Sequence, residues 1–284
     1  MTARFLDVTI EQYHADPCEA PSLSVSIAAE LINKSPLHAW QIHPRLGGLR
    51  RAPTEAMTDG TLIHALLLGK GEDRIAVLDV ENFKTKAAQG ARADAIIAGK
   101  AVVKATDYEA AKEVAKILKG KMAELGIVLD GLSEQAIEWL EPTEDEGDVL
   151  CRAMLDHLVV RFSNVTEATV FDLKSIRCAN QRTIKRHIIE YCYDVQEAAY
   201  RSAVGAVSPE SRGRVDFVFL FCEIEPPYDI APVRLNGMWR ALGENKWHHA
   251  CRTWARCLAN KRWPGYADQI ITVEPPPWAL TEGA

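Results

Sequence analysis

The sequence predicts a mixed α/β (α+β) fold in which a central mixed sheet is flanked by helices. Short apolar runs with the spacing of strands occur at residues 132–141, 150–161, 168–175 and 214–223. Segments with helical spacing lie between and around them, most clearly at residues 54–69, 106–125 and 236–261. The length of 284 residues and the hydrophobic content of 48% are enough for one sizeable core.

We expect a single domain over residues 22–270, with a lead-in at 1–21 and a proline-rich tail at 271–284. The lead-in lacks the apolar core of a signal peptide, and no stretch approaches the roughly 20 apolar residues of a membrane span. The seven cysteines are scattered and form no Cys-x-x-Cys pair, which favours free thiols in a reducing compartment. These features predict a cytoplasmic protein without a membrane partner.

In the first half of the chain, helices are predicted at residues 22–32, from residue 37, and at 54–69. The third has one strongly buried face and directs His64 into the core or a cleft. A strand is expected at residues 74–80, a polar connection of uncertain structure at 82–105, and an amphipathic helix at 106–125.

In the second half, strands at residues 132–141, 150–161 and 168–175 form a meander, with an acidic turn at 143–148. Helices follow at 179–191 and 194–206, the second capped by Asp194. A buried strand at 214–223, a shorter strand at 229–234 and a long helix at 236–261 complete the domain.

The second and third strands of this meander each carry an acidic residue into an apolar run. Because side chains alternate along a strand, Asp172 and Lys174 share one face. A hairpin turning at Ser163-Asn164 would bring Asp156 beside Asp172. Unpaired charges resist burial, and a divalent cation would neutralise the two carboxylates. Two surface acids with a salt-bridged lysine would give the same spacing, so this pattern alone leaves both interpretations open.

Charge is unevenly distributed along the chain, although its net value is −6. Residues 173–189 contain five basic side chains and no acidic one, and residues 234–262 contain seven basic side chains against Glu244. Such segments can form a phosphate-binding strip, although solvated helix faces give the same pattern.

The motifs occur in the order Gly60-x3-His64, Glu134, Asp156, Asp172-Leu173-Lys174 and Gln196-x3-Tyr200. This order resembles the PD-(D/E)XK nuclease superfamily in its RecB-like branch. It is more closely similar to the RecE-type exonuclease VIII family of phages and prophages, through the phrases GTLIHALLLG, SEQAIEW, CRAMLDHL, FDLKS, YDVQEAAY and WPGY. The resemblance covers residues 22–266, and it departs from the family pattern at Asp59 and at Met154-Leu155.

The resemblance implies roles for these residues. Asp156 and Asp172 would hold Mg2+, or Mn2+ in its place, helped by His64 and the backbone carbonyl of Leu173. Lys174 would position or deprotonate the attacking water, or stabilise the developing oxyanion. Glu134 would be a supporting carboxylate or a ligand of a second metal, with Glu138 as the weaker choice. Gln196 and Tyr200 would orient Lys174 and the scissile strand. The expected contacts to DNA phosphates are Ser175, Arg177, Arg182, Lys185 and Arg186.

The implied activity is that of a Mg2+-dependent exodeoxyribonuclease acting on the ends of linear double-stranded DNA. Digestion would run 5′→3′ and leave 3′ overhangs for recombination by a single-strand annealing recombinase, the expected partner. The resemblance also implies a ring-shaped homo-oligomer, a trimer or tetramer. Two alternatives stand beside it: a Cas4-like or repair nuclease acting on single-stranded or branched DNA, disfavoured by the absence of a four-cysteine set, and a non-catalytic DNA-binding or assembly protein.

Overall fold

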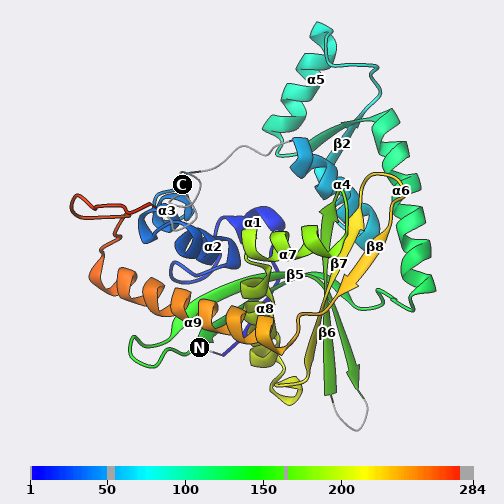
Figure 1. Cartoon of the computed structure of the whole chain (residues 1–284). Helices are drawn as coiled ribbons and strands as arrows, with labels where there is room; N and C mark the ends of the chain where they lie inside the picture. Colours follow the sequence, from blue (N-terminus) through cyan, green and yellow to red (C-terminus); the bar gives the residue numbers. More distant parts are fainter. Residues whose placement is uncertain (1, 50–54, 163–165, 276–284) are drawn as a thin grey trace, which may run out of the picture.

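A six-stranded mixed sheet forms the centre of the molecule (Figure 1). The computed structural model describes residues 2–49, 55–162 and 166–275, apart from the side chains of residues 55–61 and 162. The strand order is β1-β4-β5-β6-β7-β8. β6 and β7 run parallel, and the other neighbours run antiparallel. The predicted mixed sheet flanked by helices is confirmed.

The predicted meander forms the middle of this sheet. It consists of β4 (Leu132–Glu141), β5 (Val149–Phe162) and β6 (Thr166–Ile176). The predicted hairpin residues Ser163-Asn164 lie outside the described residues. β7 (Val215–Glu223) and the edge strand β8 (Ile230–Val233) follow after two helices.

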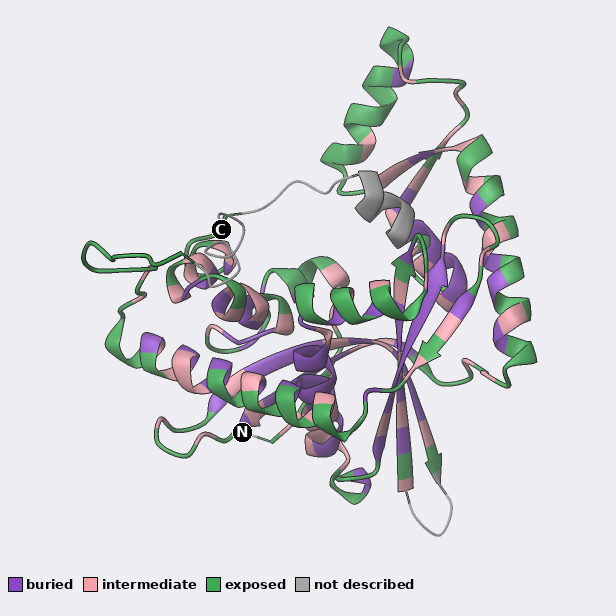
Figure 2. Cartoon of the chain, in the orientation of Figure 1, coloured by how far each residue is buried: buried purple, intermediate pink, exposed green. Residues whose placement is uncertain are grey.

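One face of the sheet carries the larger core. It is covered by α2 (Val25–Asn33), α3 (Pro36–Ile42), α7 (Gln181–Glu190), α8 (Tyr193–Val207) and α9 (Gly237–Asn260). Figure 2 shows the buried residues gathered on the strands and on the inner sides of α8 and α9. The largest of them are aromatic: Trp139, Trp247, Trp254, Phe217, Phe219 and Phe221.

The second core lies on the other face, under α4 (Glu55–Leu68) and α6 (Ala105–Glu124). Leu62 and Leu66 of α4 and Leu118 of α6 pack with Leu173 and Leu220 of the sheet. α4 therefore buries its predicted apolar face. In α6 the buried face is rotated from the predicted one: Ala111, Ala115, Leu118 and Met122 are buried, whereas Ile117 is 41% exposed.

A smaller unit projects from this side of the molecule (Figure 1). The parallel pair β2 (Ile75–Leu78) and β3 (Ala101–Lys104) carries α5 (Lys86–Ile97). A 3-10 turn, Glu72–Arg74, leads into β2. The predicted strand at 74–80 is therefore present, but outside the central sheet. The polar connection at 82–105 contains the exposed helix α5, in which Ala88 is the one residue that is buried.

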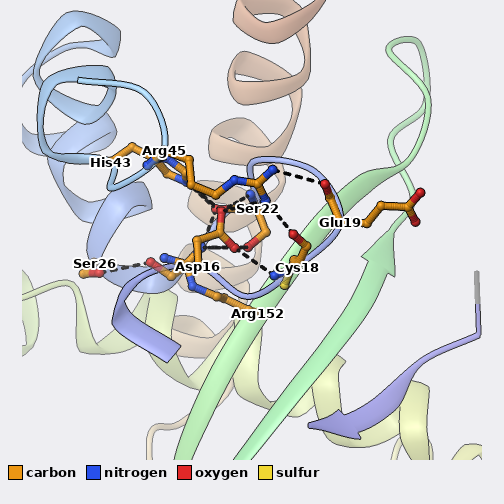
Figure 3. A network of polar contacts seen from close by, with 9 residues as sticks. Asp16, Cys18, Glu19, Ser22, Ser26, His43, Arg45 and Arg152 are labelled. Atoms are coloured by element: carbon orange, nitrogen blue, oxygen red, sulfur yellow. Dashed lines mark hydrogen bonds and ion pairs between the residues drawn. The ribbon is translucent and has the colours of Figure 1, made fainter. Parts of the chain in front are cut away.

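The lead-in at residues 1–21 is part of the folded domain. β1 (Arg4–Leu6) pairs with β4, and α1 (Ile10–His14) begins with a capping box between Thr9 and Gln12. Beyond α1 the carboxylate of Asp16 is buried in a polar network with Ser22, His43 and Arg152 (Figure 3). These contacts join the start of the chain to β5, and no local sequence pattern predicts them.

One predicted cap is wrong. The residue that precedes α8 is Cys192, whose φ of 55° is left-handed, and Asp194 lies inside the helix. Asp194 is fully buried and accepts a hydrogen bond from Lys246 Nζ at 2.7 Å. Aspartate favours the cap position of a helix, but here the contact with Lys246 of α9 holds Asp194 inside the helix.

The seven cysteines are all free, as predicted, and six of them are buried. None of the described helices is both long enough and apolar enough to span a bilayer.

Candidate active site

The predicted acidic residues meet where β5 and β6 separate. The last pair in their ladder is His157 with Phe171, so Asp156 and Asp172 are the next residues along the two strands. Burial raises the pKa of Asp172 to about 6; the charge of Lys174 opposes this effect and that of Asp156 adds to it. The two carboxylates therefore share one electrostatic site.

Each carboxylate oxygen of Asp172 has a partner. Lys174 Nζ lies 2.5 Å from Asp172 Oδ1, and Gln196 Nε2 of α8 donates to Asp172 Oδ2 at 2.6 Å. Asp172 is 1% exposed and the Lys174 side chain 17%. Although burial opposes a charge on Lys174, the neighbouring Asp172 raises the pKa of this lysine above its usual value. Lys174 is consequently a cation.

Asp156 is held by α4 and by the backbone of β6. His64 Nε2 lies 3.0 Å from Asp156 Oδ2, and the Leu173 amide donates to the same oxygen at 2.8 Å. Burial works against both charges, yet the attraction between them raises the pKa of His64 and lowers that of Asp156. The histidine predicted from α4 thus reaches the acidic pair.

β4 and β5 are both irregular next to Asp156. Ser133 pairs with His157 and Gln135 with Leu155, so Glu134 lies opposite Asp156. Glu134 has a φ of 53°, in the left-handed region that costs free energy for any residue other than glycine. On β5 the core-facing positions change phase between Leu155 and Leu158. Because Leu155 faces the larger core, strand alternation turns the next residue, Asp156, to the opposite face, where His64 of α4 contacts it.

The two candidate glutamates have different surroundings. Glu134 forms an ion pair with Arg74 and adds to the charge that raises the pKa of His64. Glu138 is 1% exposed and pairs with Arg4 of the edge strand at 2.6 Å. The geometry places Glu134, and not Glu138, beside the candidate site.

Gln196 and Tyr200 lie on the same face of α8 and are equally buried, but their partners differ. Gln196 bonds to Asp172 and not to Lys174, the partner expected from the sequence. Tyr200 is 8% exposed and its ring lies 6.1 Å from that of Phe217 in the larger core. Burial raises the pKa of Tyr200 well above its usual value.

Sequence reasoning missed Tyr193. Lys174 Nζ lies over the Tyr193 ring at 4.5 Å from its centroid, a cation–π geometry. The signal was available, because Tyr193 precedes Gln196 by three residues and so shares its helix face.

The predicted phosphate contacts lie on the surface beside this site. Ser175 lies near the end of β6, Arg177 directly follows the strand, and Arg177 Nε lies 3.4 Å from Glu225. Arg182, Lys185 and Arg186 are exposed on α7, and within the part of the chain that the structure describes no ion pair involves them. Their charges are thus free to face a polyanion.

The donor atoms suit a hard divalent cation, since two carboxylates and an imidazole lie together. Among the described residues, however, no group of three or more His, Cys, Asp or Glu side chains is arranged to hold a metal ion. Lys174, Gln196 and His64 engage the carboxylate oxygens of Asp172 and Asp156. Leu173 presents its amide to Asp156, and the role of its carbonyl stays a prediction.

This sheet, with two acids and a lysine where neighbouring strands separate, defines a PDDEXK-like domain, the class of fold that nucleases use. The model of the family described as "PDDEXK-like domain of unknown function (DUF3799)" matches residues 30–274, and the chain belongs to this family.

A solved structure is similar over the full length. It is the crystal structure of a protein from Eubacterium rectale described as a "putative exonuclease", with a TM-score of 0.61 and 12% identity, covering 98% of this chain and 100% of the other. At this identity the likeness establishes the fold alone. No curated protein shows significant similarity to the chain.

Proposed function

We propose that this chain is a metal-dependent exodeoxyribonuclease that degrades linear double-stranded DNA from its ends. The observation that carries the proposal is the buried Asp172–Lys174 ion pair beside Asp156, at the point where β5 and β6 separate. Two carboxylates with a cation where two central strands separate suit hydrolysis of a phosphodiester, whose transition state gains negative charge.

Asp156 and Asp172 would hold Mg2+, with His64 and the Leu173 carbonyl completing the ligands and Mn2+ as a substitute. The cation supplies charge neutralisation at the phosphate and lowers the pKa of water. The ion pair with Asp172 and the Tyr193 ring favour the charged form of Lys174, which supports a role in stabilising negative charge on the phosphate over a role in removing a proton. Gln196 fixes the orientation of Asp172, and Glu134 adds negative charge next to His64.

A polyanionic substrate is supported by where the basic residues lie. Besides α7, the projecting unit carries five basic residues against one acid between positions 82 and 104. Four of these bases are exposed: Lys84, Lys86, Arg92 and Lys100. Bases outnumber acids on this segment and on α7, although Glu72, Asp73, Asp79 and Glu81 lie just before it in the same unit, so local positive patches are compatible with the net charge of −6.

The finer assignment rests on the resemblance to RecE-type exonucleases. On that basis digestion runs 5′→3′ and leaves 3′ overhangs, which a single-strand annealing recombinase takes up in the host cytoplasm. A trimeric or tetrameric ring around the DNA would join the basic strips of its subunits into one channel. Analytical ultracentrifugation tests the ring, and a monomer at high concentration would contradict it.

End-labelled linear duplex tests the activity directly. The purified protein is incubated with duplex labelled at the 5′ or 3′ end, in Mg2+, Mn2+ or EDTA, next to the Asp172→Ala variant. We expect early release of the 5′ label, dependence on the cation, and no cleavage by the variant. Intact linear duplex in both metals would refute the proposal. Cleavage of single strands or branched DNA alone would favour the repair-nuclease alternative, and binding without cleavage would favour the non-catalytic one.

A further inference from the structure

A row of aromatic rings leads from Lys174 to the surface of the molecule. The Tyr193 ring, under the Lys174 ammonium, stacks on Phe219 with centroids 5.6 Å apart and an interplanar angle of 29°. The Tyr191 ring also packs on Tyr193, with centroids 5.7 Å apart and an angle of 32°. Tyr191 is 49% exposed, so the row ends in solvent.

The backbone is shaped to bring the two tyrosines together. Residues two apart on a helix do not face each other. Here Cys192, between them, is buried in the left-handed conformation with φ 55° and ψ 44°, where α7 ends and α8 begins. A left-handed residue that is not glycine costs free energy, and such positions concentrate at functional sites.

The exposed end of this row has the chemistry of a nucleic-acid contact. His187 packs its ring edge-on against Tyr191, with centroids 5.1 Å apart and an angle of 88°, which limits the movement of the exposed ring. Lys185 and Arg186, on the same helix, are exposed. Aromatic rings next to basic side chains bind unpaired nucleotides, since the bases stack on the rings and the cations attract the backbone.

We propose that Tyr191 is a stacking platform for an unpaired base of the strand being cut, and that Tyr193 is the positioning residue that couples this platform to Lys174. The inference rests on the proposed function and adds a substrate requirement to it. A duplex end must fray by at least one base pair, so that a free base lies on Tyr191 while its phosphate reaches Lys174.

Binding without cleavage tests the platform. A short single strand with 2-aminopurine at its 5′ terminal position is titrated with the full chain in EDTA, and both the quenching of the base and the anisotropy of a distant label are followed. We expect quenching with wild type and Tyr191→Phe. Tyr191→Ala is expected to lose the quenching and to bind about tenfold more weakly, in the range of one lost base–aromatic stack.

Tyr266→Ala is the matched control, because Tyr266 is also exposed and also packs on a histidine, His38, at 5.1 Å. Unchanged quenching and affinity in Tyr191→Ala, with wild type active, would overturn the platform and leave the proposed function standing. Absence of cleavage by wild type on every DNA tested would instead remove the function on which the platform rests.

Tyr193 is tested by conservative rescue. Tyr193→Phe keeps the ring and is expected to cut duplex DNA at nearly the wild-type rate, whereas Tyr193→Leu is expected to cut at least tenfold more slowly with normal thermal melting. Equal rates for the two variants would show that the ring does not position Lys174.

Discussion

At the scale of single residues, the candidate site is an arrangement of buried and half-buried charges that contact one another. Asp172 contacts Lys174 and Gln196, and Asp156 contacts His64. Burying one such charge without its partners would be costly, so the set is stable only as a unit. Substituting one member should therefore also disturb the partners that it contacts.

Lys174→Met should lower the initial rate of nucleotide release from linear duplex by about 10²- to 10³-fold, because a fixed cation at the developing charge is removed. Lys121→Met is the matched control, since Lys121 also pairs with an aspartate, Asp229 at 3.0 Å, but outside the site. A Lys174→Met rate within threefold of wild type would contradict the assigned role.

Substitutions at Glu134 and at Glu138 should differ in their effects on the cleavage rate and on the free energy of unfolding. Glu134→Gly removes the carboxylate but relieves the left-handed strain, so we expect slower cleavage and a free energy of unfolding within about 1 kcal/mol of wild type. Glu138→Gln should keep its cleavage rate and lose about 1 kcal/mol of stability, because its charged hydrogen bond with the exposed Arg4 is weakened. Urea unfolding and rate measurements on both variants check this, and full activity in Glu134→Gly would exclude Glu134 from the site.

At the scale of elements, the polar network around Asp16 joins the start of the chain to the sheet (Figure 3). Asp16 accepts hydrogen bonds from the amide and hydroxyl of Ser22, at 2.9 and 2.7 Å, and its carboxylate lies 3.2 Å from Arg152 and 3.3 Å from His43. Burial would favour the neutral acid, but these partners lower the pKa of Asp16 to about 2. The network therefore stabilises the fold as long as Asp16 is charged.

Asp16→Asn should lower the free energy of unfolding by about 2 kcal/mol near pH 7, the value of a carboxylate pKa lowered from 3.8 to about 2. Since the folded-state pKa is the lower one, this stability is complete above pH 3.8 and is lost as the pH falls toward 2. Urea unfolding of both proteins should show a difference that shrinks over this interval. A difference that stays constant with pH would contradict the assignment, and Glu146→Gln, which affects an exposed pair with Arg256, should be nearly neutral.

At the scale of the whole molecule, the proposed binding of DNA by an acidic chain depends on the segregation of its charges. The exposed bases of the projecting unit belong to a part that contributes little to either core, as the exposed surface of α5 in Figure 2 illustrates. Replacing Lys84, Lys86, Arg92 and Lys100 by alanine should therefore leave folding intact. It should reduce the slope of log K against log salt for duplex binding by up to about 3.6, since each phosphate contact contributes about 0.9.

The control for this experiment is Lys112→Ala with Lys116→Ala on α6, where each lysine lies three residues from a glutamate that already engages it. These variants should keep the wild-type slope in fluorescence anisotropy titrations between about 50 and 200 mM salt. An unchanged slope in the quadruple variant would show that the projecting unit does not contact DNA.

The sequence by itself determined the periodic elements and the members of the site that those elements align. Strand alternation puts Asp172 and Lys174 on one face, and helical spacing puts Gln196 and Tyr200 on another; both periods follow from local backbone geometry. The meander order likewise follows from short connections, which keep consecutive strands adjacent.

Only the tertiary structure decided the rest. The pairing of β1 with β4, the left-handed conformations of Glu134 and Cys192, and the burial of Asp194 and Asp16 all depend on partners that are distant in the chain. Contacts of this kind can outweigh local preference, because a buried ion pair or a packed core contributes more free energy than the propensity of one residue. The ion pair of Glu134 with Arg74 and the place of Tyr193 under Lys174 belong to this second group.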